Sequence, residues 1–128
     1  MPKQIHRGSD IHDSGLPFSQ VVEANGLVFI AGQVGDAPGT HGAVPGGIGP
    51  QTRAMLENVG RLLRAVGLDY GDVVRSTVYL VDFDAFAEYN AVYREFFPVD
   101  PPARATVGVA RLVGEYLIEI EVTAARRA

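Results

Sequence analysis

Two side chains in the last quarter of the chain are of the types needed to bind a small substrate by its carboxylate and to hydrolyse it. Arg104 stands at the start of one predicted strand and Glu119 lies within the next. A guanidinium at a sheet rim can bind a carboxylate through two parallel hydrogen bonds, and a nearby carboxylate can orient or deprotonate a water. The pair predicts a minimal hydrolytic site for an anionic substrate. It also fits a structural Arg–Glu cross-strand pair, and spacing alone leaves both interpretations open.

Other residue types that commonly carry catalysis are poorly placed. The histidines His6, His12 and His41 show no metal-ligand pair spacing, and the four serines lack the context of a nucleophile elbow. The sequence contains no cysteine, and its single lysine, Lys3, lies near the N-terminus, where a Schiff base is improbable. We therefore expect no bound metal and no cofactor.

The composition is that of one folded domain spanning residues 1–128, with 47% hydrophobic and 20% charged residues. Eleven basic residues face fifteen acidic ones, so the formal net charge is -4. Nucleic-acid binding then lacks its usual electrostatic driving force. No apolar run approaches the length of a membrane span. We expect a cytoplasmic protein with neither nucleic acid nor membrane as its partner.

Hydrophobic patterning predicts a β-hairpin followed by a helix. The runs 18–24 and 27–34 flank Asn25-Gly26, the dipeptide favoured in two-residue type I′ turns. In the segment 50–66 apolar residues recur at steps of three and four, which is typical of a helix with one buried face. Gly67 follows as its C-terminal cap.

The second half of the chain predicts one more helix and three strands. The β-branched run 73–81 is a strand, Asp82 or Asp84 caps a helix over 86–97, and the segments 104–112 and 116–124 are strands. Phe86, Tyr89 and Tyr93 share one face of this helix, and we interpret them as core packing. The order β-β-α-β-α-β-β predicts an α+β fold, in which two helices cover one face of a mixed sheet.

The last predicted strand carries acidic residues on the face that the helices leave open. Ile118, Ile120 and Val122 alternate with Glu119 and Glu121. Carboxylates would be costly on a dry face, so we expect subunit contacts with water or a ligand nearby. The pattern therefore predicts oligomerisation through the sheet.

The segment PPARATVGVARLVGEYLIEIEVTA resembles the C-terminal signature of the reactive intermediate deaminase family, also called Rid or YjgF. Four further segments resemble the family in the same order: LPFSQ at 16–20, FIAGQV at 29–34, QTRAMLENV from 51, and FAEYNAVYREFF at 86–97. The resemblance covers nearly the whole chain.

The resemblance implies a chorismate-mutase-like α+β fold assembled as a homotrimer, with ligand sites between subunits. It implies hydrolysis of reactive 2-enamine and 2-imine acids, such as 2-aminoacrylate and 2-iminobutanoate, to 2-keto acids and ammonia, without a cofactor. Arg104 corresponds to the arginine that binds the substrate carboxylate, and Glu119 to the acid that positions the water. Asn90 and Gly32 correspond to residues lining the cleft, and Thr106 to a position whose backbone contacts the substrate.

Three positions depart from the family pattern. Phe18 stands where tyrosine is common, Ala31 where serine is common, and Val113 where a proline usually follows the leucine. The two missing hydroxyls, each worth about 1 kcal/mol as a hydrogen bond, predict lower activity or a changed side-chain preference.

Alternative functions stay open at this point. The chain could be a non-catalytic trimeric module that binds small carboxylates, or a relative acting on an aminoacrylate from pyrimidine degradation. A ribonuclease role fits poorly with the acidic balance. The first 14 residues could form a disordered lead or a strand that closes over the cleft.

Overall fold

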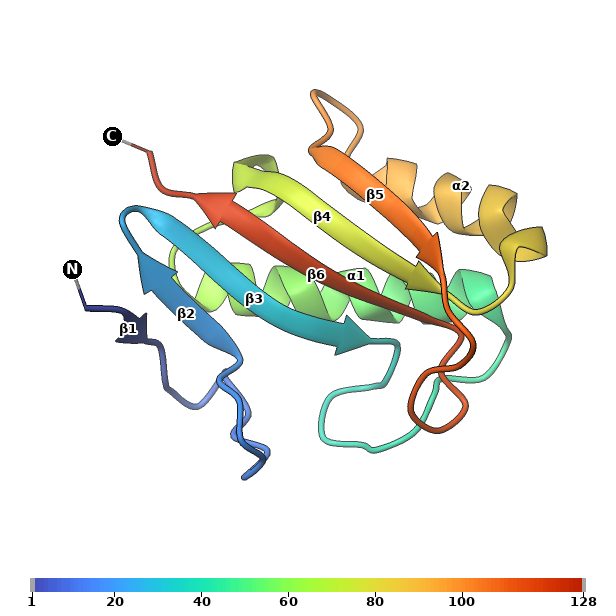
Figure 1. Ribbon diagram of the computed structural model, residues 1–128, viewed down its shortest axis with the longest axis horizontal. Coiled ribbons are helices and arrows are strands. Elements are labelled where there is room, and N and C mark those ends of the chain that lie inside the picture. The colour runs from blue at the N-terminus through green and yellow to red at the C-terminus, as the bar shows by residue number, and fades with distance from the viewer. Residues whose placement is uncertain (1, 128) are drawn as a thin grey trace.

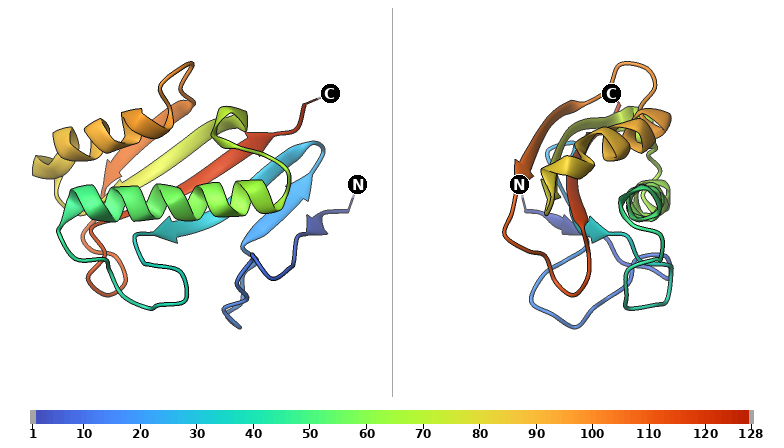
Figure 2. Two further views of the ribbon diagram at one scale, coloured as in Figure 1. Left: turned by 180° about the vertical axis from the view of Figure 1, so that it is seen from behind. Right: turned by 90° about the vertical axis from the view of Figure 1, so that its right-hand side faces the viewer.

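The computed structural model describes residues 2–127 and contains a single six-stranded mixed sheet with the order β1-β2-β3-β6-β4-β5 (Figure 1). Both helices lie on one face of the sheet, and the other face is open (Figure 2). The helices are α1, Ile48–Ala65, and α2, Phe86–Phe96. The strands are β1 Gln4–Ile5, β2 Val21–Ala24, β3 Leu27–Val34, β4 Val73–Leu80, β5 Ala103–Gly108 and β6 Ile118–Ala125.

The last strand of the chain lies in the middle of the sheet. β6 pairs antiparallel with β3 on one side and with β4 on the other. β5 pairs only with β4, in parallel, and α2 supplies the crossover that a parallel pair requires. β5 is therefore an edge strand, although it directly precedes β6 in the sequence.

The predicted hairpin and first helix are confirmed. Asn25 and Gly26 both have the positive φ angles, 54° and 78°, that a type I′ turn demands. The first helix begins at Ile48, two residues earlier than predicted, because proline is accommodated in a first helical turn. At its end the amide of Gly67 donates to the carbonyl of Arg64, with Gly67 at a φ of 81°.

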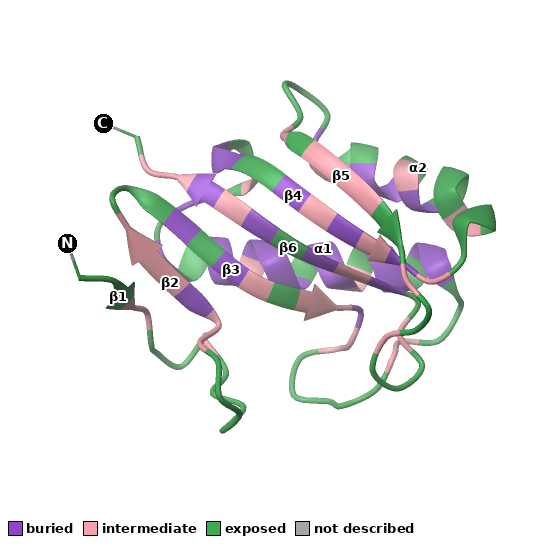
Figure 3. Ribbon diagram, in the orientation of Figure 1, coloured by how far each residue is buried: buried purple, intermediate pink, exposed green. Residues whose placement is uncertain are grey.

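The core lies between the sheet and the two helices. Met55, Val59 and Leu63 of α1 are fully buried, and so are Ile118 and Ile120 of β6. Burial alternates along β6 and β4 (Figure 3), as the hydrophobic pattern of the last strand predicted. None of the described helices is long and apolar enough to cross a lipid bilayer.

The predicted boundaries of four strands were too long. β2 begins at Val21, three residues later than predicted. β4 ends at Leu80, β5 ends at Gly108, and β6 begins at Ile118. The amide of Val109 donates to the carbonyl of Leu80, after which the chain leaves the sheet and reverses at Gly114, where φ is 57°. The apolar residues of 109–117 belong to this loop, so their β propensity was overridden.

Residues 2–14 contain a short strand at the edge of the sheet. β1 extends the sheet by pairing with β2. His6 Nε2 lies 2.7 Å from Glu23 Oε1, and the guanidinium of Arg126 donates two hydrogen bonds to the same carboxylate at 2.7 and 2.9 Å. A further bond of 2.8 Å joins Arg126 to the carbonyl of Val66. Glu23 thereby links His6 to Arg126, and Arg126 links both to the end of α1.

The Glu23 cluster predicts an acid-sensitive contribution to stability. Hydrogen bonds from Arg126 and His6 lower the pKa of Glu23 from 4.5 to about 2. The stabilisation is therefore complete above pH 4.5 and is lost as the pH falls toward 2. In urea titrations, Glu23→Gln should lower the free energy of unfolding at neutral pH. The difference in unfolding free energy between this variant and the wild type should shrink as the pH falls from 4.5 toward 2.

The matched control is Glu95→Gln, which removes a solvent-exposed ion pair with Arg53. An exposed pair contributes at most about 1 kcal/mol, so this variant should stay close to the wild type. A difference for Glu23→Gln that is independent of pH would contradict the assignment.

Candidate functional site

The guanidinium of Arg104 is held on the helix side of β5. Its Nη1 donates to Asn90 Oδ1 of α2 at 2.8 Å. Its Cζ lies 4.8 Å from the ring centre of Tyr93, 5.0 Å from that of Tyr89 and 5.9 Å from that of Phe86. Cation–π contacts of this kind fix the plane of the guanidinium. Arg104 is thus positioned by one amide and the aromatic stripe of α2.

No acidic side chain within residues 2–127 forms an ion pair with Arg104. Burial raises the pKa of both Tyr89 and Tyr93 above its usual value, so these phenols remain neutral. A half-buried cation among neutral groups keeps most of its five donors available and favours an anion. The arrangement can bind a carboxylate from outside the chain.

Glu119 lies on the open face of the sheet, and its carboxylate lies beside Gly32 of β3. A side chain at Gly32 would overlap Oε2 of Glu119, so the glycine provides the space that this carboxylate occupies. Burial raises the pKa of Glu119, and the charge of Glu121 raises it further. Within residues 2–127 no group donates a hydrogen bond to the Glu119 carboxylate, which is therefore free to bind water.

A cavity of about 570 Å³ opens beside Glu119 and is lined otherwise by the loop after β5, from Arg111 to Gly114. Val113, one of the positions that departs from the family pattern, is 81% exposed in this loop. A small molecule can therefore approach the Glu119 carboxylate from the open face.

Arg104 and Glu119 do not meet within one copy of the chain. β4 separates their strands: Arg104 is in register with Ser76, and Glu119 with Tyr79. Ser76 is buried on the helix side, where its hydroxyl lies 2.8 Å from that of Tyr93. Three residues along a strand reverse the face, so Glu119 points away from the helices. The interpretation of Arg104 and Glu119 as a cross-strand pair was wrong. A single copy of the chain does not bring the two side chains together in one hydrolytic site.

The other candidate residues divide between the same two places. Thr106 and Asn90 lie beside Arg104, and the Thr106 hydroxyl lies 2.7 Å from that of Tyr89. Gly32 and Ala31 are neighbours on β3, near Glu119. Phe18 is 51% exposed in the segment leading into β2, which β3, β6 and β4 separate from β5.

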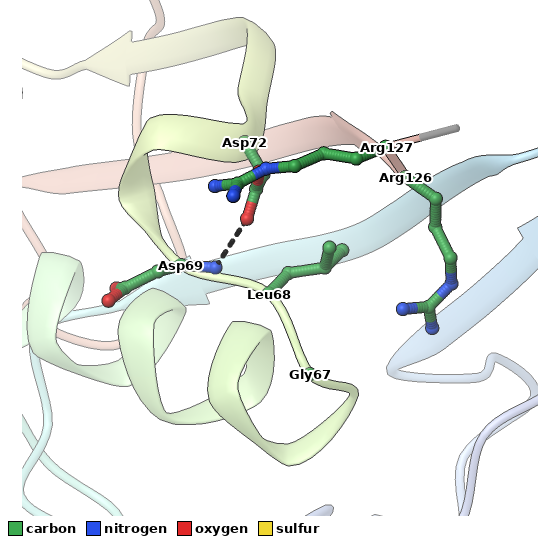
Figure 4. Close-up of a pocket in the computed structure, with 6 residues that line it drawn as sticks. All are labelled: Gly67, Leu68, Asp69, Asp72, Arg126 and Arg127. Carbon is green, nitrogen blue, oxygen red and sulfur yellow. Dashed lines mark hydrogen bonds and ion pairs between the residues drawn. The ribbon is translucent and has the colours of Figure 1, made fainter.

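A second hollow is also lined by arginines, but unlike Arg104 these arginines form ion pairs with carboxylates. This hollow, of about 330 Å³, lies where β6 ends beside the end of α1 (Figure 4). Arg127 donates to Asp72 at 3.0 Å, and Arg126 points away from it toward Glu23. Since both cations already have carboxylate partners, this hollow is a weaker candidate for binding an anion.

Sequence reasoning named Asn90 but missed the aromatic residues that hold the guanidinium. It interpreted Phe86, Tyr89 and Tyr93 as core packing, yet their rings also face Arg104. The available signal was the position of Asn90 directly after Tyr89 on the aromatic face. Arg111, beside Glu119, was missed as well, and nothing in its sequence context distinguishes it.

A family model and several known proteins match most of this chain. Residues 11–126 match the family model described as Endoribonuclease L-PSP. A RutC family protein of Pyrococcus horikoshii is 46% identical over 84% of this chain and 86% of its own. The 2-iminobutanoate/2-iminopropanoate deaminase of Mus musculus is 39% identical over 84% and 80%. The crystal structure of E. coli TdcF with bound serine is 35% identical, with a TM-score of 0.87 over 97% and 99% of the two chains.

The environment of Glu119 predicts a specific response to a neighbouring substitution. Glu121→Gln removes a negative charge but keeps an oxygen that accepts from Tyr79, its present partner. The pKa of Glu119 should fall, and it should remain above 4.5 because burial is the larger cause. Carboxyl NMR titration measures both values, and an unchanged or higher pKa would contradict this electrostatic account.

Proposed function

The chain belongs to the reactive intermediate deaminase (Rid, YjgF) family, and on that premise we propose that it hydrolyses 2-imino acids, with their 2-enamine tautomers, to 2-keto acids and ammonia. The observation that carries the proposal is the Arg104 guanidinium, held among neutral groups with most of its donors available. The relatives named 2-iminobutanoate/2-iminopropanoate deaminase support this reaction class. The bound serine of TdcF is consistent with an amino-acid-like carboxylate as ligand.

The proposed site joins two copies of the chain. Because Arg104 and Glu119 lie on opposite faces of one sheet, a substrate between them requires Arg104 from one copy and Glu119 from another. Phe18, at the far side of the sheet from β5, would likewise reach Arg104 only from a neighbour. The family resemblance favours a homotrimer.

Two features of the sheet support assembly. Leu27, Phe29 and Val107 are 38%, 42% and 41% exposed, and all three lie on the open face. β5 is an edge strand, and its unpaired backbone groups would otherwise face solvent. The same free edge leaves the backbone near Thr106 available to a substrate.

The proposed mechanism needs only orientation and proton transfer, because imines already hydrolyse in water. Arg104 binds the carboxylate and fixes the imine carbon. Glu119 accepts a proton from a water whose oxygen attacks that carbon, and the C=N electron pair moves to nitrogen. Glu119 then returns the proton to nitrogen, which gives a carbinolamine. Glu119 next takes the hydroxyl proton of this intermediate and passes it to nitrogen, so that the C–N bond breaks with its electron pair on nitrogen, the C=O bond forms and ammonia leaves. The raised pKa of Glu119 suits a group that both accepts and donates.

The absence of hydroxyls at Phe18 and Ala31 bears on the rate and not on the reaction class. Neither residue can donate a hydrogen bond to the substrate or water from its side chain. Arg104 and Glu119 carry the charges that the mechanism uses, so we propose an enzyme in preference to a module that only binds carboxylates.

A coupled assay tests the proposal directly. A threonine dehydratase generates 2-iminobutanoate, and the wild-type chain should accelerate its disappearance above the spontaneous rate. Arg104→Ala should lower kcat/KM by about 10- to 100-fold, the loss of one charge-assisted carboxylate contact. Arg104→Lys should recover part of this, because it restores the charge without the planar fork.

Glu119→Gln separates binding from catalysis in the same assay. The amide keeps the size of the side chain but cannot accept the proton, so kcat should fall about 100-fold or more with little change in KM. A wild-type protein that binds 2-oxobutanoate but leaves the imine at its spontaneous rate would identify a binding module. An Arg104→Ala protein with full activity would contradict the proposal.

Subunit mixing tests whether the site is shared. Arg104→Ala and Glu119→Gln chains are each expected to have strongly reduced activity, and unfolding and refolding them together produces mixed assemblies. A shared site then has both native groups in about one position in four, and activity should return. Remixing each variant with itself is the control. Mixed trimers, verified by native mass spectrometry, that stay inactive would contradict a shared site.

A further inference from the structure

An exposed pair of phenylalanine rings lies beside the Arg104 guanidinium. Phe83 belongs to the 3-10 turn Phe83–Ala85 before α2, and Phe86 begins α2. Their ring centres are 5.7 Å apart with an angle of 12° between the planes. Phe83 is 49% exposed and Phe86 36% exposed. The prediction that aromatic residues of α2 serve core packing does not account for this stacked pair.

The stacked pair continues the row of rings that surrounds Arg104. The ring centres of Phe86 and Tyr89 are 5.8 Å apart, and those of Tyr89 and Tyr93 are 5.9 Å apart. Arg104 Cζ lies over the last three of these rings. Phe83 is therefore the ring farthest along an apolar path that begins at the cation.

Gly108 holds the Phe83 ring in place at the end of β5. A methyl group at Gly108 would lie 3.0 and 3.2 Å from two carbons of the Phe83 ring. The backbone of Gly108 does not have a positive φ, so the close approach of the ring, and not the backbone conformation, is what requires glycine here. The ring is thus seated against the strand although half of it is open to solvent.

We propose that Phe83 and Phe86 form a subsite for the side chain of the substrate, and that the chain prefers 2-imino acids with an aromatic or extended apolar side chain. The inference rests on the proposed function, in which Arg104 binds the carboxylate. A ligand held there has its side chain within reach of a preformed apolar wall. Aromatic side chains stack well on such a wall, whereas a methyl group covers little of it.

Continuity with the cation distinguishes this pair from an ordinary exposed apolar patch. Phe86 contacts both the guanidinium and Phe83, so one ligand can occupy the charged and the apolar parts together. Of the neighbouring ionisable groups, Asp82 and Asp84 lie in the turn, where the Asp82 carboxylate accepts from the amide of Asp84. Their negative charges disfavour a second carboxylate, so the proposed side chain is uncharged.

The experiment compares calorimetric binding of two stable product analogues, phenylpyruvate and pyruvate, to the intact protein. The wild type should bind phenylpyruvate about tenfold more tightly than pyruvate. Phe83→Ala should remove most of this preference while its affinity for pyruvate stays within about twofold of the wild type. Phe83→Leu should give an intermediate preference, and thermal melts of both variants verify folding.

Val99→Ala is the matched control, because Val99 is 75% exposed and lies outside the aromatic row. It should keep the wild-type preference. Equal affinities for the two keto acids in the wild type, or a preference unchanged in Phe83→Ala, would overturn the subsite and leave the deaminase proposal standing. Failure of both acids to bind in an Arg104-dependent manner would overturn the proposed function and the subsite with it.

Discussion

A half-buried guanidinium with only neutral partners is the constraint around which this molecule is arranged. Arg126 and Arg127 have carboxylate partners in Glu23 and Asp72, whereas Arg104 has one amide oxygen and three aromatic rings. The rings and the amide orient the cation without neutralising it, so the guanidinium can still bind an anion supplied from outside. α2 thus has two roles, because Tyr89 and Tyr93 fill the core and also hold the cation.

Sheet topology determines which side chains can lie close to the Arg104 guanidinium. Insertion of β6 between β3 and β4 places Glu119 at the start of an inner strand, on the open face, and leaves β5 at the edge. The two charged groups therefore face different directions, and a second copy of the chain is the simplest way to bring opposite groups together. The proposed assembly would cover the exposed apolar residues of the open face and would bring the two parts of the divided site together.

Local patterns in the sequence predicted the parts of this fold that local physics determines. Asn25-Gly26 specified the turn, and the period of Met55, Val59 and Leu63 specified α1 and its buried face. Strand order and the end of β5 depend on pairings between distant residues, so no local pattern contained them. The residue types of the candidate site were recognised through Arg104 and Glu119, but their separation by β4 follows from strand order alone.

The most direct test of the account is a crystal structure of the protein with 2-oxobutanoate, the keto product of the proposed reaction. We predict that the ligand carboxylate forms two hydrogen bonds with Arg104 and that its keto carbon faces Glu119 of a neighbouring copy. A carboxylate bound elsewhere, with Arg104 still bonded only to Asn90, would contradict the central claim.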